Sequence, residues 1–504
     1  MQMKIAFFKS NTTFLNNLEK FERRRLFLLL LIQLILYAYL LVTIPLHYDE
    51  WFSWRFFSGT DFFKTFSNYP APNNHIFYNL VARCFILTGI DVEIATRIPS
   101  LLASLLTSYY FYKICKLNFS QGLSLVLLLI LIAFDHFIFY SISARGYSFV
   151  NLFCVWLIYS SMLLSVSYSG FKNRLLFILS QSLGLFTVPS FLYVMLPVGI
   201  ILFTFLIIHR ILKQVFRLAQ DYVITLALVV LGYSGILFLG DPSHLLNPEI
   251  WTNKFTFNDP EWFNNLMFYL DTRFFDIFGF YKLKTTSLLV IFTAIYYLVK
   301  GKASDKFAVI LFALMFFSPL FIVLLHKVYP FGRTFYYLLI PGLLLLGFII
   351  NPILLRIKYI PVFLRLIKYR NYIFLLLLSF SIAAMLTFTE KNRESMSWEY
   401  HLDWLRRNKL KYVMSQYNDI SRTNVDFEFY PAEIISFMCA KEIITSHTTI
   451  TLLDSIKKQD VLIIAGSEKP KFINHLKNYQ LIFEYNDIWI YQSDKIKPVG
   501  LIYN

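Results

Sequence analysis

Long apolar runs recur between residues 26 and 389, and short connections rich in Lys and Arg separate them. A helix of roughly 20 apolar residues spans a hydrocarbon core of about 30 Å. The pattern therefore predicts a polytopic α-helical membrane protein. Eleven spans are expected, at residues 26–44, 97–114, 121–140, 147–167, 173–188, 190–208, 221–239, 285–299, 307–325, 335–355 and 372–389.

The basic connections orient these spans, because Lys and Arg favour the cytoplasmic side of a membrane. The stretch "KFERRR" (20–25) precedes the first span, so residues 1–25 are expected to form a cytoplasmic segment. The C-terminus then lies outside. The later basic connections belong on the cytoplasmic side as well, at residues 112–116, 170–174, 209–217, 300–306 and 356–370.

One shorter apolar segment, residues 75–90, has about 16 residues and carries Arg83 near its middle. If this segment crossed the membrane, every later basic connection would lie outside, against the positive-inside rule. We therefore predict an interfacial or re-entrant helix on the outer side.

The spans define a membrane domain over residues 26–390, with two large outer loops at 45–96 and 240–284. The remaining residues, 391–504, have the composition of a soluble domain. The sequence thus predicts a small α/β domain outside the membrane.

Within this tail, residues 397–417 have apolar positions at helical spacing. The stretch "DVLIIAGS" (460–467) is typical of a buried strand. Residues 481–492 predict two strands joined through Asn486 and Asp487, a common two-residue hairpin turn.

The composition of the chain is that of a membrane protein, and its net positive charge must be interpreted accordingly. Of the 504 residues, 57% are hydrophobic and 15% are charged, against roughly 25% charged in an average soluble domain. The net charge of +16 would suggest nucleic acid as a partner of a soluble protein, but here it resides mainly in the connections and indicates no nucleic acid. Neither a zinc site nor a disulfide framework is expected, and no removable signal peptide is evident.

Two adjacent carboxylates, Asp49 and Glu50, follow the first span among aromatic residues in "PLHYDEWFSWRF" (45–56). Trp and Phe at this depth are typical of an interfacial aromatic belt. An ionised pair there is costly unless it is partnered or used. Asp49, repelled by its neighbour, could have a pKa suited to accepting a proton.

A second polar cluster, "NYPAPNNHIFYNLVAR" (68–83), places Asn74 and His75 at the start of the predicted interfacial helix. A proline-set turn with an asparagine cap explains one Asn without any function. It does not require His75. These side chains are candidates for hydroxyl and phosphate contacts.

Three arginines lie at predicted outer ends of spans, against the inside preference: Arg97 in "TRIPS", Arg145 in "SISARGYSF" and Arg333 in "YPFGRTFYY". A single arginine at a membrane boundary is ordinary, because its long side chain reaches the interface. Their recurrence beside Gly, Pro and Tyr, including Tyr147, indicates a site for an anionic ligand, since guanidinium groups clasp phosphate oxygens.

Together, the Asp-Glu pair, "NNH", "RIPS", "ARGY" and "GRTFYYLLIP" resemble, in this order, the bacterial GT-C glycosyltransferases. More narrowly, the chain resembles the dolichyl-phosphate-mannose protein mannosyltransferase-like family, which is similar to the lipid A aminoarabinose transferase. The resemblance covers residues 20–390 by order and topology. One departure is "PNNH", where the aminoarabinose enzyme has a lysine followed by prolines, so donor-head specificity is expected to differ.

The resemblance implies an inverting transferase that uses a polyprenyl-phosphate-linked sugar as donor, at the extracytoplasmic face of the bacterial cytoplasmic membrane. It assigns the general base to Asp49, with Glu50 beside it. The acceptor is a lipid, a glycan or a protein. Contacts to the donor and its phosphate are expected from Asn74, His75, Arg97, Arg145, Tyr147 and Arg333.

Metal independence is expected, although some relatives use a divalent cation held by acidic loop residues. Near the start of the first loop the other acidic residue is Asp61, and "DPEW" (259–262) in the second loop is a weak candidate for a partner. No other cofactor is predicted.

Two other classes of function remain open. A transporter or flippase of a lipid-linked sugar also needs spans and buried polar groups, but it favours charges near the bilayer midplane and paired repeats. Here the polar clusters gather on one face and no repeat is visible. A scaffold that presents the tail leaves the ordered motifs unexplained.

Overall fold

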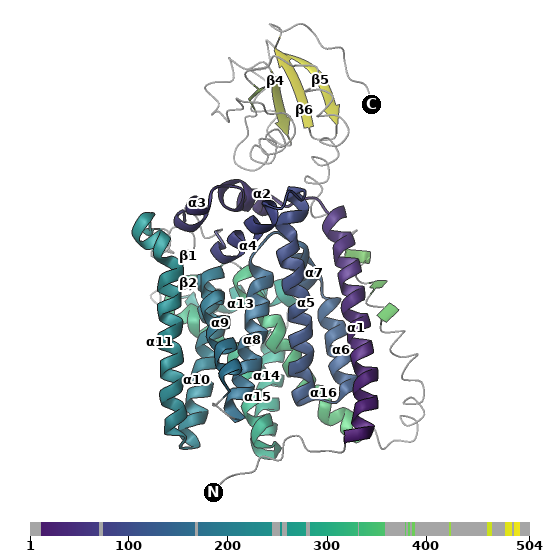
Figure 1. Cartoon of the computed structure of the whole chain (residues 1–504), viewed down its shortest axis with the longest axis vertical. Helices are drawn as coiled ribbons and strands as arrows, with labels where there is room; N and C mark the ends of the chain where they lie inside the picture. The colour runs from purple at the N-terminus through teal and green to yellow at the C-terminus, as the bar shows by residue number, and fades with distance from the viewer. Residues whose placement is uncertain are drawn as a thin grey trace. The chain divides into compact units, whose positions relative to one another are not determined.

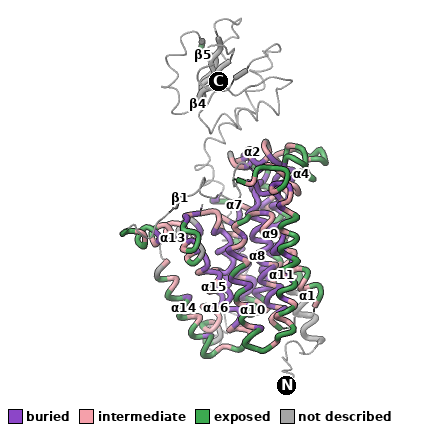
Figure 2. The backbone as a smooth tube through the Cα atoms, turned by 90° about the vertical axis from the view of Figure 1, so that its left-hand side faces the viewer, coloured by how far each residue is buried: buried purple, intermediate pink, exposed green. Residues whose placement is uncertain are grey.

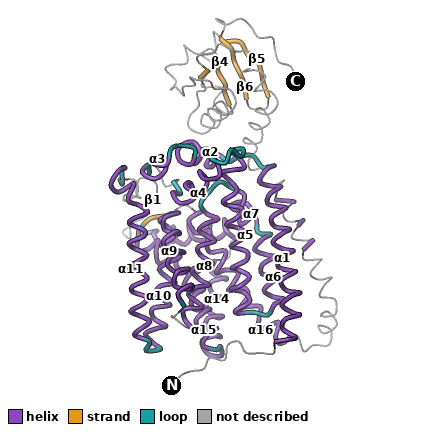
Figure 3. Tube along the Cα trace, viewed as in Figure 1, coloured by secondary structure: helices purple, strands orange, loops and turns teal. Residues whose placement is uncertain are grey.

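The computed structural model divides the chain into two compact units, Met1–Leu41 with Asp61–Phe388, and Val42–Thr60 with Thr389–Asn504. The first unit is a helix bundle and the second contains a small β-sheet (Figures 1 and 3). The described residues are 12–69, 74–166, 170–243, 253–254, 260–278, 283–330, 332–357, 378–379, 382–383, 386–388, 423–424, 461–465, 479–485 and 488–493.

The described helices of the bundle follow the apolar runs. They are α1 (Thr12–Thr43), α3 (Phe62–Ser67), α4 (Ile76–Ile86), α5 (Val92–Asn118), α6 (Gln121–Ile132), α7 (Asp135–Ile142), α8 (Tyr147–Val166), α9 (Phe171–Thr187), η2 (Pro189–Phe191), α10 (Leu192–Ile208), α11 (Leu212–Ser234), η3 (Gly235–Leu239), α13 (Trp262–Phe278), α14 (Leu283–Lys300), α15 (Ala303–His326), η5 (Gly332–Leu338) and α16 (Leu339–Ile357). Two short strands, β1 (Asn253–Lys254) and β2 (Val328–Tyr329), pair antiparallel.

Ten of the eleven predicted spans coincide with these helices. Among the described residues, six helices are long and apolar enough to cross a membrane, and a bent pair makes a seventh. The protein is therefore a multi-pass membrane protein. The count of eleven stays a prediction, because most of the range 372–389 lies outside the described residues.

Burial separates the centre of the bundle from its lipid-facing edge (Figure 2). In α8, 72% of the span is buried, whereas in α11 the share is 22%. Exposed leucines, isoleucines and phenylalanines on α11 are expected to contact lipid, where apolar side chains need no protein partner. The central position of α8 places the residues before it deep in the fold.

The predicted span at 121–140 is broken, because α6 and α7 meet at a bend of 62°. A bend leaves backbone carbonyls at the end of α6 without helical partners. The hydroxyl of Tyr37, on α1, donates a hydrogen bond to the carbonyl of Ile132 at 2.7 Å. The break is thus stabilised by a side chain from another helix.

The short helix α4 has 11 residues. Its length of about 16 Å is too short for a bilayer core of about 30 Å, as expected for an interfacial or re-entrant helix. An apolar cluster joins its start to the far end of α11, through Tyr69, Ile76, Tyr233 and Ile236. Helices α3 and α4 therefore lie at the end of the bundle where α11 finishes (Figure 1).

The second unit contains α2 (Tyr48–Ser53), the π-helical turn η1 (Trp54–Ser58) and a four-stranded sheet in the order β3-β4-β6-β5. The predicted strands at 460–467 and 481–492 are present as β4 and as the antiparallel pair β5 and β6. The hairpin turn and the helix predicted at 397–417 lie outside the described residues. The strands are β3 (Thr423–Asn424), β4 (Val461–Ala465), β5 (Tyr479–Tyr485) and β6 (Ile488–Ser493).

Candidate active site

His75 is the residue around which the candidate site of the bundle is built. It precedes the first turn of α4 and is buried, with 2% of its surface exposed. Its Nδ1 accepts a hydrogen bond from the backbone N–H of Gly146, which lies between α7 and α8, at 2.9 Å. The neutral imidazole must therefore carry its proton on Nε2. That Nε2–H is buried and has no hydrogen-bond partner among the residues that the structure describes.

Gly146 allows this close approach. A Cβ built on it would lie 2.3 Å from His75 Nδ1 and 2.8 Å from a methyl carbon of Thr187. No other residue type fits without displacing these neighbours. The glycine of the "ARGY" motif therefore explains how the His75 ring and the backbone before α8 come into contact.

The side chains of Arg145 and Tyr147 flank the same imidazole. The Tyr147 ring packs edge-on against His75, with centroids 4.9 Å apart, and the guanidinium of Arg145 lies 5.8 Å from the Tyr147 ring centre. Arg145 is buried, with 3% of its surface exposed. Its backbone is anchored by N–H donation to the carbonyl of Ser143 at 2.8 Å.

Burial, and then the positive charges of Arg145 and Arg333, hold the pKa of His75 well below its usual range. His75 is therefore a neutral hydrogen-bond donor at physiological pH. Arg145 and Arg333, which are far apart in sequence, are linked through two tyrosines: Arg145 lies beside the Tyr147 ring, which packs on Tyr140, and Tyr140 and Arg333 line one cavity. Four residues predicted from the sequence, His75, Arg145, Tyr147 and Arg333, thus converge.

Arg333 opens onto a polar cavity of about 330 Å³ formed by α7, α13 and η5. Two arginines, Arg273 and Arg333, contribute to its wall. The Tyr140 ring connects the cavity to the His75 cluster, since its centroid lies 4.9 Å from that of Tyr147 and 4.5 Å from that of Tyr336. The cavity is lined by His136, Tyr140, Arg273, Ile277, Gly332, Arg333 and Tyr336.

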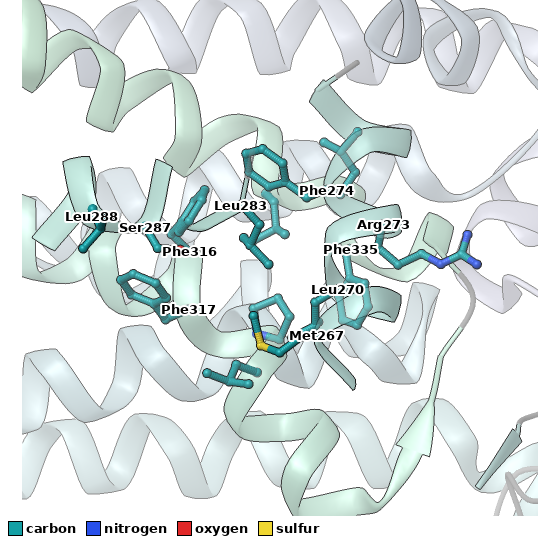
Figure 4. Close-up of a pocket in the computed structure, with 14 residues that line it drawn as sticks. Met267, Leu270, Arg273, Phe274, Leu283, Ser287, Leu288, Phe316, Phe317 and Phe335 are labelled. Carbon is teal, nitrogen blue, oxygen red and sulfur yellow. The ribbon is translucent and has the colours of Figure 1, made fainter. Parts of the chain in front are cut away.

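A second cavity, of about 350 Å³, is almost wholly apolar and lies between α13, α14, α15 and η5 (Figure 4). Phe274, Phe316, Phe317 and several aliphatic side chains surround it. Arg273 lines both cavities, and Figure 4 shows its guanidinium pointing away from the aromatic side chains. The two cavities are therefore adjacent at Arg273, with the charged group on the polar side.

Asn74 and Arg97, both predicted to contact the donor, form hydrogen bonds within the protein. The amide of Asn74 donates to the carbonyls of Asn68, at 2.6 Å, and Thr65, at 3.2 Å. Its oxygen accepts a hydrogen bond from Asn79 at 2.9 Å. These bonds fix the chain that leads into α4, so Asn74 positions His75.

Arg97, near the start of α5, is buried and donates from Nη1 to the carbonyl of Leu41 at 2.9 Å. This bond ties α5 to the last turns of α1. The hydrogen bond to Leu41 gives the buried guanidinium of Arg97 a role in helix packing. A role of Arg97 in binding the donor stays a prediction.

The two carboxylates of the second unit differ in their surroundings. The Asp49 N–H donates to His47 Nδ1 at 3.3 Å, and the His47 N–H donates to the Glu50 carboxylate at 2.8 Å. This reciprocal arrangement is a capping box that starts α2. Glu50 is buried, with 2% exposed, and helps to close the helix end, whereas Asp49 is half-buried.

Asp61, considered above as a second acid for a metal, caps α3. Its Oδ1 accepts a hydrogen bond from the Lys64 N–H at 2.8 Å. No group of three His, Cys, Asp or Glu side chains within the described part of the chain could hold a metal ion. The "DPEW" segment (259–262) is only partly described.

Four residues that line the polar cavity were not predicted from the sequence: His136, Tyr140, Arg273 and Tyr336. His136 and Tyr140 lie in "DHFIFYSISARGY" (135–147), where the polar residues Asp135 and His136 follow an apolar run. Arg273 lies in a segment predicted as loop. Its signal in the sequence is a cation directly before "FFDIF" (274–278), and both lie on the 17-residue helix α13.

No family model and no curated protein matches the chain. ArnT from Cupriavidus metallidurans is similar in structure: in the apo state its TM-score is 0.55, with 11% sequence identity over 92% of this chain and 97% of that chain. The same protein bound to undecaprenyl phosphate has a TM-score of 0.59 with the same identity and coverage. An oligosaccharyltransferase from Archaeoglobus fulgidus, in complex with Zn and sulfate, has a TM-score of 0.47, with 11% identity over 92% of this chain and 73% of that chain. The likeness to ArnT confirms the predicted GT-C fold.

Proposed function

We propose that the protein is a glycosyltransferase that moves a monosaccharide from a polyprenyl-phosphate-linked donor to an acceptor hydroxyl. The main support is the junction of the two cavities at Arg273. An apolar cavity beside one lined by two arginines matches a ligand with a long hydrocarbon chain and an anionic head. Undecaprenyl phosphate, bound in the ArnT structure of the same fold, is a ligand of this chemistry.

In the proposed reaction, Asp49 removes the proton of the acceptor hydroxyl while its oxygen attacks the anomeric carbon. The bond from that carbon to the phosphate oxygen breaks, its electron pair leaves with the phosphate, and the configuration inverts. Arg145, Arg273 and Arg333 stabilise the negative charge on the departing phosphate. His75, with its proton on Nε2, donates to an oxygen of the phosphate or the sugar.

The arrangement of α2 supports Asp49 rather than Glu50 as the base. Glu50 accepts the His47 N–H and closes the start of the helix. A carboxylate held in that way is a positioning group for its neighbour. We therefore assign separate roles to the two adjacent acids: Asp49 takes the proton of the acceptor hydroxyl, and Glu50 positions Asp49.

The site is proposed to act at the extracytoplasmic face of the bacterial cytoplasmic membrane. The positive-inside pattern supports this side for the loops that carry Asp49, His75, Arg145 and Arg333. The acceptor is a lipid, a glycan or a protein hydroxyl, and the transferred sugar is a hexose or pentose. Neither metal nor another cofactor takes part in the proposed reaction.

Purified protein supplied with a radiolabelled polyprenyl-phosphate sugar and a membrane extract as the source of acceptor tests the proposal. Asp49→Asn is expected to bind the lipid donor but to lower transfer by about 10²- to 10⁴-fold, the usual contribution of a general base. Transfer at the wild-type rate by this variant would refute the assignment of the base.

Arg273→Met tests the junction of the cavities, because methionine keeps the apolar body and removes the charge. Its affinity for undecaprenyl phosphate is expected to fall by about 10- to 100-fold, as one charge-assisted contact is lost. Lys116→Met, in the last turn of α5, is the matched control and should bind as the wild type does. Movement of intact donor across liposomes without transfer would favour a flippase.

A further inference from the structure

Helices α9 and α11 run parallel to each other. Arg174, near the start of α9, contacts Asp221 in the first half of α11, and near the ends of both helices the Tyr233 hydroxyl donates to the carbonyl of Leu185 at 2.7 Å. Because the end of α11 packs against α3 and α4, the starts of both helices lie at the opposite end of the bundle from the candidate active site.

Basic residues concentrate where these helices begin. The segments 170–174 and 209–221 contain five Lys and Arg residues and one acidic residue, Asp221. The basic residues are Lys172, Arg174, Arg210, Lys213 and Arg217. The surplus of positive charge attracts anions at this end of the bundle.

The single acid is already neutralised. Arg174 donates to Asp221 Oδ1 from Nη2 at 2.5 Å and to both carboxylate oxygens from Nε at 3.1 Å. Asp221 is fully buried, whereas a quarter of the Arg174 side chain is exposed. The ion pair thus holds a guanidinium at a fixed position on the outer surface of the bundle.

A cavity of about 580 Å³ lies beside this guanidinium. Its wall is Arg174 together with one face of α11, and α11 is largely exposed along its span. Phe216 and Val223 are each 67% exposed. The lining residues are Arg174, Phe216, Ala219, Gln220, Val223 and Ile224.

Along α11, the chemistry changes in the order that a phospholipid requires. Positions 213, 217, 220 and 224 follow one another at helical spacing on one face. From the start of the helix inward they are Lys213, Arg217, Gln220 and Ile224. Charged groups at the level of a headgroup therefore precede an amide and then apolar side chains at the level of acyl chains.

We propose that this groove, formed by α11 and Arg174, binds one anionic phospholipid. The lipid phosphate contacts Lys213, Arg217 and the exposed part of Arg174, and an acyl chain lies along Phe216, Val223 and Ile224. Basic pockets between membrane helices favour anionic headgroups in this way. The site is separate from the proposed donor cavities, which lie on α7, α13, α14, α15 and η5.

Native mass spectrometry of the full chain in detergent, with phosphatidylglycerol or phosphatidylcholine titrated in, measures this binding. The double variant Lys213→Gln with Arg217→Gln is expected to lose affinity for phosphatidylglycerol by about 30-fold, from two charges near the membrane surface. Lys300→Gln with Lys302→Gln, which removes two charges between α14 and α15, is the matched control and should bind normally.

The groove itself is tested by Arg174→Gln with Asp221→Asn, which removes both charges of the pair and leaves no unpaired buried carboxylate. It is expected to weaken phosphatidylglycerol binding and to leave transfer activity unchanged. The exposed single variant Lys213→Gln decides the question if a double variant does not fold.

Three outcomes would overturn the proposal. Equal affinity for phosphatidylcholine would show that the headgroup charge is not recognised. Competition by millimolar inorganic phosphate would identify a site for a free anion rather than a lipid. An equal loss in the variant at Lys300 and Lys302 would show that only the overall charge of the protein matters.

Discussion

Replacing Gly146 with alanine tests whether the contact between His75 and the backbone before α8 organises the site. The added Cβ would lie 2.3 Å from His75 Nδ1, and ordinary contact begins at 3.4 Å, so the imidazole must move by about 1.1 Å. Tyr147, with its ring centroid 4.9 Å away, restricts that movement.

The cost follows from two terms. Overpacking a buried site costs about 1–3 kcal/mol, and weakening the bond from the Gly146 N–H to His75 costs about 0.5–1.5 kcal/mol. We therefore expect Gly146→Ala to lower the free energy of unfolding by about 1.5–4.5 kcal/mol. A misplacement of about 1 Å at a reacting group lowers the rate by about 10²-fold, so transfer should fall by a similar factor.

Unfolding in detergent and transfer of the labelled sugar measure the two effects. Gly122→Ala, on α6, is the control, because a Cβ there meets nothing within 4 Å and alanine favours a helix. Adding His75→Ala to Gly146→Ala removes the clash with the imidazole but leaves the Thr187 methyl carbon 2.8 Å from the new Cβ, so stability should recover in part and transfer should not. Wild-type stability and transfer in Gly146→Ala would refute the role of this contact.

Four further expectations concern other parts of the chain. Glu50→Ala should lower the helix content of a peptide covering the first outer loop, by circular dichroism, because loss of the capping box costs about 1 kcal/mol; an unchanged spectrum would contradict it. His75 has a lowered pKa in the folded protein, so stability present above its unfolded pKa of about 6.5 should be lost as pH falls below that value, and His75→Gln should remove this dependence in unfolding scans. EDTA should leave transfer unchanged; loss that Mg²⁺ or Mn²⁺ restores would show a metal requirement. A reporter fused after residue 390 should report an outer location, and a cytoplasmic signal would overturn the eleven-span count.

The helices could be predicted because their signal is local. A run of apolar residues determines a membrane helix almost by itself, and the basic connections then orient it. The strands β4, β5 and β6 were predictable for the same reason, from short apolar runs bounded by turn residues. Even the short helix α4 followed from its length and from the charges around it.

Only half of the polar site could be predicted in this way. His75, Arg145 and Arg333 were found because each is a polar residue in a motif on the predicted outer side. Arg273 was not found, because its place in the wall of the polar cavity depends on the packing of α13 against η5. These two elements are far apart in sequence, so no local sequence pattern predicts their contact. Asn74 is the opposite case, a residue predicted to contact the ligand whose side chain has a structural role instead. Its amide group forms hydrogen bonds with Asn68, Thr65 and Asn79.

The break between α6 and α7 links these observations. Neither Pro nor Gly occurs at residues 131–136, so sequence alone favours one continuous span. The bend of 62° instead turns α7 so that His136 and Tyr140 reach the polar cavity and the chain arrives at Gly146 in contact with His75. Because the Tyr37 hydroxyl binds the Ile132 carbonyl, the break does not leave that buried acceptor unsatisfied. The irregular part of the bundle is therefore where the charged and aromatic groups of the candidate site are assembled, as expected when a departure from regular structure serves a function.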